Sequence, residues 1–270
     1  MLAGHYTTAL LAYQKFPKGT LIFFLIASQF QDLVWLTLHY LGIEPTEPNS
    51  VENVTLQGID VNMLFSHDLL PQLFWLLAIF LIGRLLFKSN KIGATGGLLV
   101  LGHFILDFIS GYPHHIFGEE THTIGLGLYH SNVYLAIAIE GLVSTLALFY
   151  FFKKEKEKGI ERTTKNKFYI IGLFVFGVVF LLLIATTSFK DWFGLPDLNV
   201  MFNTTIPTLI LTYIGMIFYL NYFVLENLKI IVIKNGQFYN YQLTSLDRHD
   251  RNHFRFQVLD TPAYLEAAHQ

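Results

Sequence analysis

The sequence contains no cysteine. Disulfide bonds and thiolate metal sites are therefore excluded, and only histidine and carboxylate side chains remain as metal ligands. Charged residues are also scarce, at 14% of the chain, whereas apolar residues make up 53%. The chain has no Walker loop, dinucleotide-binding fingerprint, Gly-x-Ser-x-Gly elbow or internal repeat. Its chemistry must therefore come from a small number of polar residues in an apolar setting.

Long apolar runs are what the chain has instead. Its mean hydropathy is +0.44, far above that of an ordinary soluble domain. Lipid offers no hydrogen-bond partners to the backbone, so each run is expected to form an α-helix. The runs long enough to span are residues 20–42, 69–87, 92–112, 125–152, 168–188 and 205–225. We therefore expect an all-α integral membrane protein, a polytopic bundle of six long spans.

The first sixteen residues are expected to add a short N-terminal helix. They do not match a cleaved signal peptide, because Lys15 and Lys18 follow the apolar run instead of preceding it. As a helix they rise roughly 24 Å, less than the roughly 30 Å thickness of the hydrocarbon core. The segment either crosses a thinned membrane at a tilt or lies flat at its surface.

Basic residues alternate with the spans in a way that favours one orientation. Short loops rich in lysine and arginine stay in the cytoplasm. Such residues gather at every second end of the helices, at Lys15, Lys18, Arg84, Lys88, Lys91 and the run from Lys153 to Lys167. This pattern predicts a plasma (inner) membrane protein with a cytoplasmic C-terminus and a solvated loop at the 153–167 run. The N-terminus faces out if the first helix crosses, and in if it lies flat.

Residues 226–270 are too polar to span and are expected to form a small cytoplasmic tail next to the bundle of residues 1–225. Asn235 and Gly236 are a strong turn signal between β-rich arms within residues 230–242, which predicts a β-hairpin. The alternating residues 253–258 predict a third strand. We expect the tail to cap the bundle, with contact to a partner as the alternative.

One ionisable pair lies inside the third predicted span. His103 and Asp107 are one helical turn apart, so they point to the same side of an otherwise apolar segment. Ionisable groups at this depth are costly and by default mark a functional site.

Other ionisable residues are expected at a similar depth. Counting about 1.5 Å per residue from the basic ends places His5, Asp32 and Glu140 near the same level, with His67 above them as a lid. Groups at such depth must satisfy one another or a cation. We predict one or two divalent metal ions, zinc with manganese or iron as alternatives, held by His5, Asp32, His67, His103 and Asp107. Glu140 or Asp68 is the expected general base or supporting partner, and His114, His115 and His130 are candidates to line the entrance.

Four short motifs resemble a known family. Gly4-His5, Gln29-Phe-Gln-Asp32-Leu, Phe65-Ser-His67-Asp-Leu-Leu and Leu101-Gly-His103-Phe-Ile-Leu-Asp107-Phe-Ile-Ser occur in the order seen in bacterial membrane-bound metal-dependent hydrolases. One member type of that family is LexA-regulated, and its motifs are distantly similar to those of zinc-dependent phospholipase C. The resemblance covers about residues 1–145 and implies the same five metal ligands. The chain departs from the family where Pro-Asp-x-Asp-His is usual, because it keeps only Asp32, and it lacks the first basic pair of His-Arg-x-x-x-His-Ser.

These features together predict a membrane-embedded, metal-dependent hydrolase that acts on a lipid or another amphiphilic ester or phosphodiester, with its site toward the outer face. The expected partners are membrane lipids and a lipid-like or small-molecule substrate, and no nucleic acid is expected. Two alternatives use the same residues. One is a proton- or cation-coupled permease or transporter, in which glycines at 93, 96, 97 and 102 let helices slide. The other is a scaffold whose polar cluster only fastens the bundle.

Overall fold

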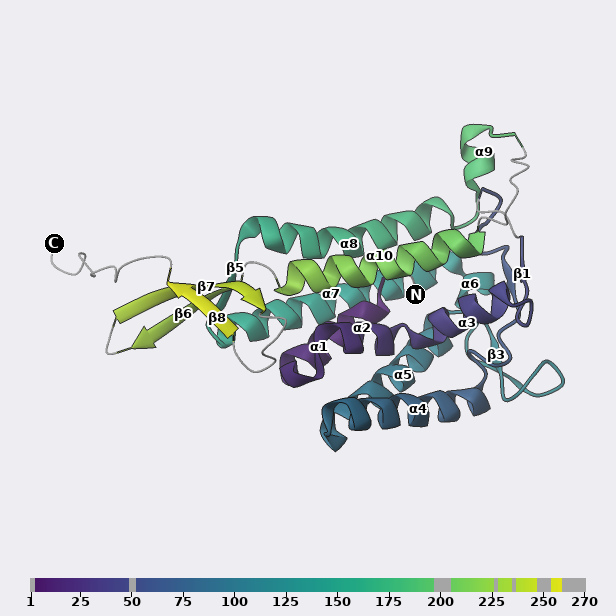
Figure 1. The fold of residues 1–270 in the computed structure, drawn as a ribbon. Helices are drawn as coiled ribbons and strands as arrows, with labels where there is room; N and C mark the ends of the chain where they lie inside the picture. Colours follow the sequence, from purple (N-terminus) through teal and green to yellow (C-terminus); the bar gives the residue numbers. More distant parts are fainter. Residues whose placement is uncertain are drawn as a thin grey trace.

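The computed structural model describes residues 3–48, 52–196, 205–225, 228–234, 237–246 and 254–258. The protein is mostly helical, with small sheets near the two ends of an elongated bundle (Figure 1). The helices that are long and apolar enough to cross a membrane are α4 (Leu69–Phe87), α5 (Asn90–Ser110), α7 (Val133–Glu157), α8 (Thr164–Leu183) and α10 (Thr205–Leu225). Their length and hydropathy agree with an integral membrane protein.

The first part of the chain forms shorter pieces. They are α1 (His5–Lys15), a 3-10 turn (Pro17–Gly19), α2 (Leu21–Ser28) and α3 (Phe30–Tyr40). We expected one helix over residues 20–42, but α2 and α3 meet at Gln29 with a bend of 62°. Within the described ranges, six spans result if this bent pair counts as one.

Helix α1 starts among buried residues rather than at a surface. His5 and Tyr6 are both fully buried, and the helix has 11 residues. It therefore rises only about 16 Å, roughly half of the hydrocarbon thickness.

Polar caps move the starts of two other helices. The predicted 125–152 run contains a separate short helix, α6 (Leu128–Ser131), and α7 begins only after Asn132, whose side chain accepts the N–H of Leu135. Thr163 likewise caps α8 by accepting the N–H of Asn166. After α8, the short helix α9 (Phe189–Phe193) follows. Side-chain caps of this kind satisfy backbone donors that a helix start leaves free, so they set the boundaries where hydropathy does not.

Two small sheets lie at the end of the bundle near α3 and α6. Strand β1 (Thr46–Glu47) pairs with β2 (Asp60–Val61), and β3 (His114–His115) pairs with β4 (Thr123–Ile124), both antiparallel. We call residues 114–124 the β3–β4 hairpin. It follows α5 directly, so it lies beside the end of the helix that carries His103 and Asp107.

A larger antiparallel sheet lies at the opposite end, in the order β5-β6-β7-β8. Its strands are β5 (Ile160–Arg162), β6 (Leu228–Lys234), β7 (Gln237–Leu246) and β8 (Phe254–Val258). The predicted turn at Asn235 and Gly236 lies outside the described residues. Strand β5 was not predicted; it comes from the connection between α7 and α8 and pairs with β6, so the tail is joined to the bundle through a shared sheet.

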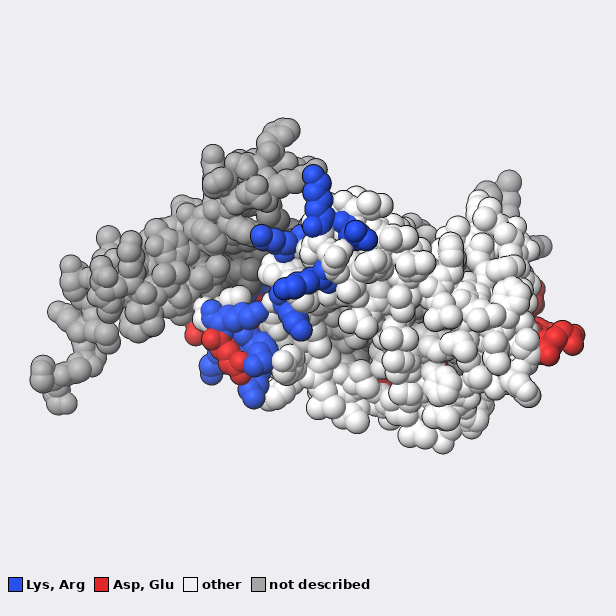
Figure 2. All heavy atoms as spheres, turned by 90° about the horizontal axis from the view of Figure 1, so that it is seen from below, with Lys and Arg blue, Asp and Glu red and all other residues white. Residues whose placement is uncertain are grey.

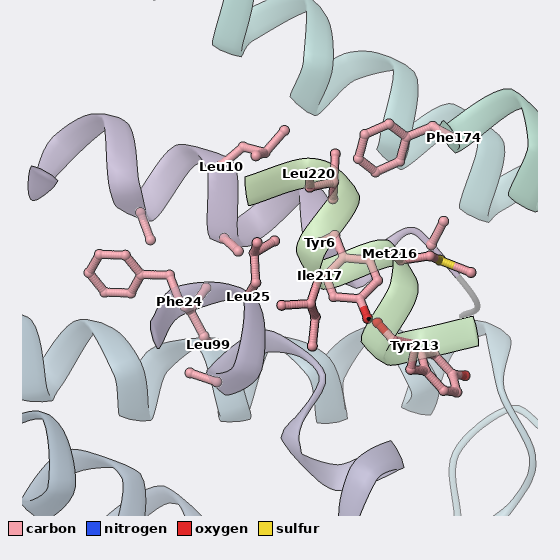
Figure 3. Packing of buried hydrophobic residues seen from close by; sticks show 14 of the residues in the cluster. Tyr6, Leu10, Phe24, Leu25, Leu99, Phe174, Tyr213, Met216, Ile217 and Leu220 are labelled. Carbon is pink, nitrogen blue, oxygen red and sulfur yellow. Dashed lines mark hydrogen bonds between the residues drawn. The ribbon is translucent and has the colours of Figure 1, made fainter. Parts of the chain in front are cut away.

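The bundle packs around one apolar cluster and one close helix pair. The cluster joins α1, α2, α5, α8 and α10 through side chains such as Tyr6, Leu25, Leu99, Phe174 and Leu220 (Figure 3). Helices α4 and α5 approach so closely that a Cβ on Gly93 would lie 2.5 Å from the carbonyl oxygen of Phe80. Small residues permit such contact between membrane helices.

Charge is distributed along the long axis of the bundle. Figure 2 shows lysine and arginine side chains gathered around one end, an acidic patch at the other, and an almost uncharged surface between them. On the face in view, this uncharged surface is what is expected of helices that face lipid.

Arg162 is an exception within the basic run, which we predicted to be solvated. Its side chain is only 7% exposed. The guanidinium donates to both carboxylate oxygens of Glu155, at 2.6 and 2.7 Å, and also to Asn166 and to the carbonyl of Val224 at the end of α10. Bidentate pairing of this kind is what allows arginine to be buried. Arg162 therefore links α7, α8 and α10.

Replacing Arg162 tests this link. Arg162→Met leaves the Glu155 carboxylate buried without its partner, so we expect a loss of about 3–5 kcal/mol of stability, measured as thermal unfolding of the detergent-solubilised protein. Lys167→Met, an exposed residue of the same run, is the matched control and should change little. Equal effects of the two substitutions would contradict a clamp at Arg162.

Candidate metal centre

Four ionisable side chains converge in the interior of the bundle. One ligand atom each of Asp32, His67, His103 and Asp107 lies within 4.8 Å of the other three, and all four residues are buried. They come from α3, from the segment before α4 and from α5. This group, which we call the four-residue cluster, can hold a metal ion.

The distances between the histidines and the aspartates of the cluster are close to those of tetrahedral coordination. His67 Nε2 lies 3.3 Å from Asp32 Oδ1 and 3.8 Å from Asp107 Oδ2. His103 Nε2 lies 3.6 Å from Asp32 Oδ1 and 3.0 Å from Asp107 Oδ2. In a tetrahedron with metal–ligand bonds of about 2.0–2.1 Å, neighbouring ligand atoms are ~3.3 Å apart. Two nitrogen and two oxygen donors suit zinc, and manganese or iron are also compatible.

The bend between α2 and α3 brings Asp32 into the cluster. Asp32 lies in the first turn of α3, just after the bend at Gln29. The Gln29 side-chain amide donates to Asp32 Oδ2, which leaves Oδ1 facing His67 and His103. The bend also ends α2 at Ser28, where carbonyl groups lack partners within the helix.

The Ser28 carbonyl fixes the tautomer of His103. His103 Nδ1 lies 2.8 Å from this oxygen, which can only accept, so Nδ1 carries the hydrogen. Nε2 of His103 makes no hydrogen bond within the described part of the chain, although carboxylate oxygens lie 3.0 and 3.6 Å away. A neutral ring would thus direct a lone pair at two carboxylates. The geometry calls for a metal ion or a proton at this point, with the proton on Nε2 or on one of the two carboxyl groups.

His67 is part of the cluster and not a lid above it. The depth count fails here because α4 begins only at Leu69, and the turn before it folds back into the bundle, with the N–H of His67 bonded to the carbonyl of Met63. Glu44 secures this turn by accepting the N–H groups of Phe65 and Ser66. Burial raises the pKa of the Glu44 carboxyl, while the two backbone bonds oppose that shift.

His5 stands beside the cluster. Its Nε2 lies 3.2 Å from Asp107 Oδ1, the oxygen that faces away from His103, and its ring stacks on His103 with centroids 3.6 Å apart. In this position His5 supports Asp107 and His103, as partners of metal ligands commonly do. Its role as a direct ligand stays a prediction.

The two predicted general bases have other contacts. Glu140, buried on α7, accepts a hydrogen bond from the Tyr129 hydroxyl. Asp68 accepts the backbone N–H groups of His115 and Gly118, at 2.9 and 2.6 Å, so it ties the residue after His67 to the β3–β4 hairpin. Catalytic roles for Glu140 and Asp68 stay predictions.

A cavity of about 110 Å³ adjoins the cluster. Asp32, His67 and Asp107 line one side of it. Aliphatic and aromatic side chains form most of the remainder, among them Leu56, Ile59, Phe180, Leu181, Ile184 and Leu209. A metal ion in the cluster would therefore face a mainly apolar chamber.

Sequence reasoning missed the roles of three residues at this site. Gln29 and Trp35 lie three residues before and after Asp32, a spacing that places them near the same helix face. His114 was expected only at an entrance, yet it is buried, lines the cavity and stacks on His67 with the ring planes 6° apart.

Comparison of the chain with family models, with curated proteins and with solved structures found no match.

Metal content tests the centre directly. We expect about one equivalent of zinc, manganese or iron in the purified protein, measured by plasma mass spectrometry after mild chelator washing. His103→Gln removes the imidazole nitrogen Nε2, the metal-binding atom that faces both carboxylates. This variant should therefore lose the metal. His122→Gln changes an exposed histidine of the β3–β4 hairpin and should retain it. A folded wild-type protein without metal would favour a proton on His103 instead.

Proposed function

We propose that this protein is a membrane-embedded, metal-dependent hydrolase that cleaves a lipid or another amphiphilic ester or phosphodiester. The observation that carries the proposal is the buried cluster of two histidines and two aspartates at the side of a mainly apolar cavity. The motifs of the first half of the chain support membership of the bacterial membrane-bound metal-dependent hydrolases.

The chain's own residues supply what such a reaction needs from a protein. A bound divalent ion lowers the pKa of a coordinated water to about 7 and polarises a substrate oxygen. The cluster would hold the ion beside the cavity, because three of its four members line the cavity. Ser28 and Gln29 orient His103 and Asp32, and His5 orients Asp107. Glu140, through Tyr129, or Asp68 supplies the proton-accepting group.

The cavity walls support an amphiphilic substrate. Leu181 lies in the last turn of α8, Ile184 directly follows that helix, and Leu209 comes from α10. These side chains offer an alkyl chain an apolar surface a short distance from the polar cluster. The polar headgroup of the substrate would then lie at the metal, and its alkyl chain would point toward the surrounding lipid.

The charge distribution supports an orientation. Basic residues at one end of the bundle would stay in the cytoplasm by the positive-inside rule, together with the C-terminal tail. The cluster then opens toward the outer face of a bacterial plasma membrane.

The broken helices favour one second candidate, a proton- or cation-coupled transporter. The short helix α1 begins at His5, and α2 and α3 meet at a bend just before Asp32. Discontinuous helices of this kind form ion sites in many transporters. In that function the positive charge at His103 is a transported proton or cation.

A turnover assay separates the two functions. With the metal-loaded protein in lipid nanodiscs, we expect release of 4-methylumbelliferone from its oleate ester or of nitrophenol from a nitrophenyl phosphodiester lipid. Removal of the metal and the His103→Gln substitution should each reduce the rate by at least about 10²-fold, since no activated water remains. His122→Gln should keep the wild-type rate.

The same protein in sealed vesicles provides the opposing readout. Proton or cation flux that depends on His103, with no product from either substrate class, would overturn the hydrolase and support the transporter.

A further inference from the structure

Two buried side chains of the cavity have hydrogen-bonding atoms without partners. Within the described residues, both ring nitrogens of His114 and Nε1 of Trp35 make no hydrogen bond. His114 is 2% exposed and Trp35 is 8% exposed, and both line the cavity beside Asp32, His67 and Asp107. Buried polar atoms are nearly always paired, and each one left unpaired is costly. These atoms are therefore expected to bond to a molecule inside the cavity.

The ring of His114 is held in place. It stacks on His67 with ring centroids 5.7 Å apart, and its centroid lies 5.8 Å from that of the tilted Phe104 ring. Its neighbour His115 is fixed through the backbone by Asp68. Asp68, the residue after His67, thus helps to fix the position of His114. The His114 ring is therefore a defined part of the cavity wall.

The two side chains offer a defined set of donors. In its neutral form the His114 ring carries one N–H and one lone pair, so it can both donate and accept a hydrogen bond. Trp35 Nε1 can only donate. Trp35 also follows Asp32 by about one turn of α3, so its indole lies on the side of the helix that faces the cluster. The cavity therefore presents N–H donors next to the centre that would hold a cation, a combination that suits an anionic oxygen.

We propose that His114 and Trp35 bind an anionic oxygen of an amphiphile, such as a phosphoryl or carboxyl oxygen, whose alkyl chain packs along Leu181, Ile184 and Leu209. That this amphiphile is a substrate, and not only a ligand, rests on the proposed hydrolase function. Binding itself requires only the cavity and its two polar side chains.

The test uses the full-length protein in detergent, both metal-loaded and chelator-washed, with titration calorimetry. The probes are dodecylphosphonate, dodecanoate and inorganic phosphate, which separate the two headgroups from each other and from a free anion. His114→Phe retains a flat ring against His67 and removes both nitrogens, and Trp35→Phe removes Nε1. His122→Phe, on the exposed side of the same hairpin, is the matched control.

We expect the wild type to bind at least one of the dodecyl probes and to bind inorganic phosphate much more weakly. His114→Phe and Trp35→Phe should each raise the Kd by about tenfold or more, with unchanged metal content, because each removes hydrogen bonds to a charged group. His114→Gln keeps a donor and an acceptor and should restore part of the affinity. Thermal unfolding checks that each variant is folded. If His114→Phe does not fold, Trp35→Phe alone tests the proposal.

Two outcomes would overturn the proposal. Wild-type affinity in folded His114→Phe and Trp35→Phe would show that these atoms bond only to water, and absence of binding to every probe would show that the cavity is not a ligand site. A protein without metal in which both variants still weaken binding would support this inference while overturning the hydrolase.

Discussion

The organisation of this protein depends on one electrostatic requirement. Two carboxylates and two imidazoles meet inside an apolar bundle, and His103 presents Nε2 to oxygens of both Asp32 and Asp107. The energy of that arrangement is acceptable only if a metal ion or a proton lies among these atoms. The surrounding contacts orient the four groups toward this common point: a backbone carbonyl fixes His103, an amide holds Asp32, and His5 occupies the far oxygen of Asp107.

Irregular backbone makes this orientation possible. In an unbroken helix over residues 20–42, the Ser28 carbonyl would accept the N–H of residue 32 and would not be free for His103. The bend at Gln29 frees this carbonyl, and the turn before α4 and the buried start of α1 bring His67 and His5 to the same place. Backbone of this kind is tolerated at membrane depth where it is enclosed by protein, and here it surrounds the cluster.

Much of the fold could be predicted from the sequence, because lipid forces long apolar runs into helices. The residues of the cluster also stood out, since the i, i+4 pair of His103 and Asp107 and the isolated Asp32 interrupt apolar segments. The bend at Gln29 gave no signal, because neither proline nor glycine lies within residues 21–40. The positions of His67 and His114 depend on turns that fold back into the bundle, and burial of Arg162 depends on Glu155, a partner that a charge count cannot identify.

The bonds from Asp68 to the β3–β4 hairpin have a consequence for access to the cavity. They join the hairpin to the residue next to His67. A movement of the hairpin away from the bundle would therefore also displace His67 and disturb the four-residue cluster. The wall formed by Ile184 and Leu209 carries no member of the four-residue cluster. A small movement of α8 against α10 at this wall would therefore change the shape of the cavity without displacing a ligand of the centre.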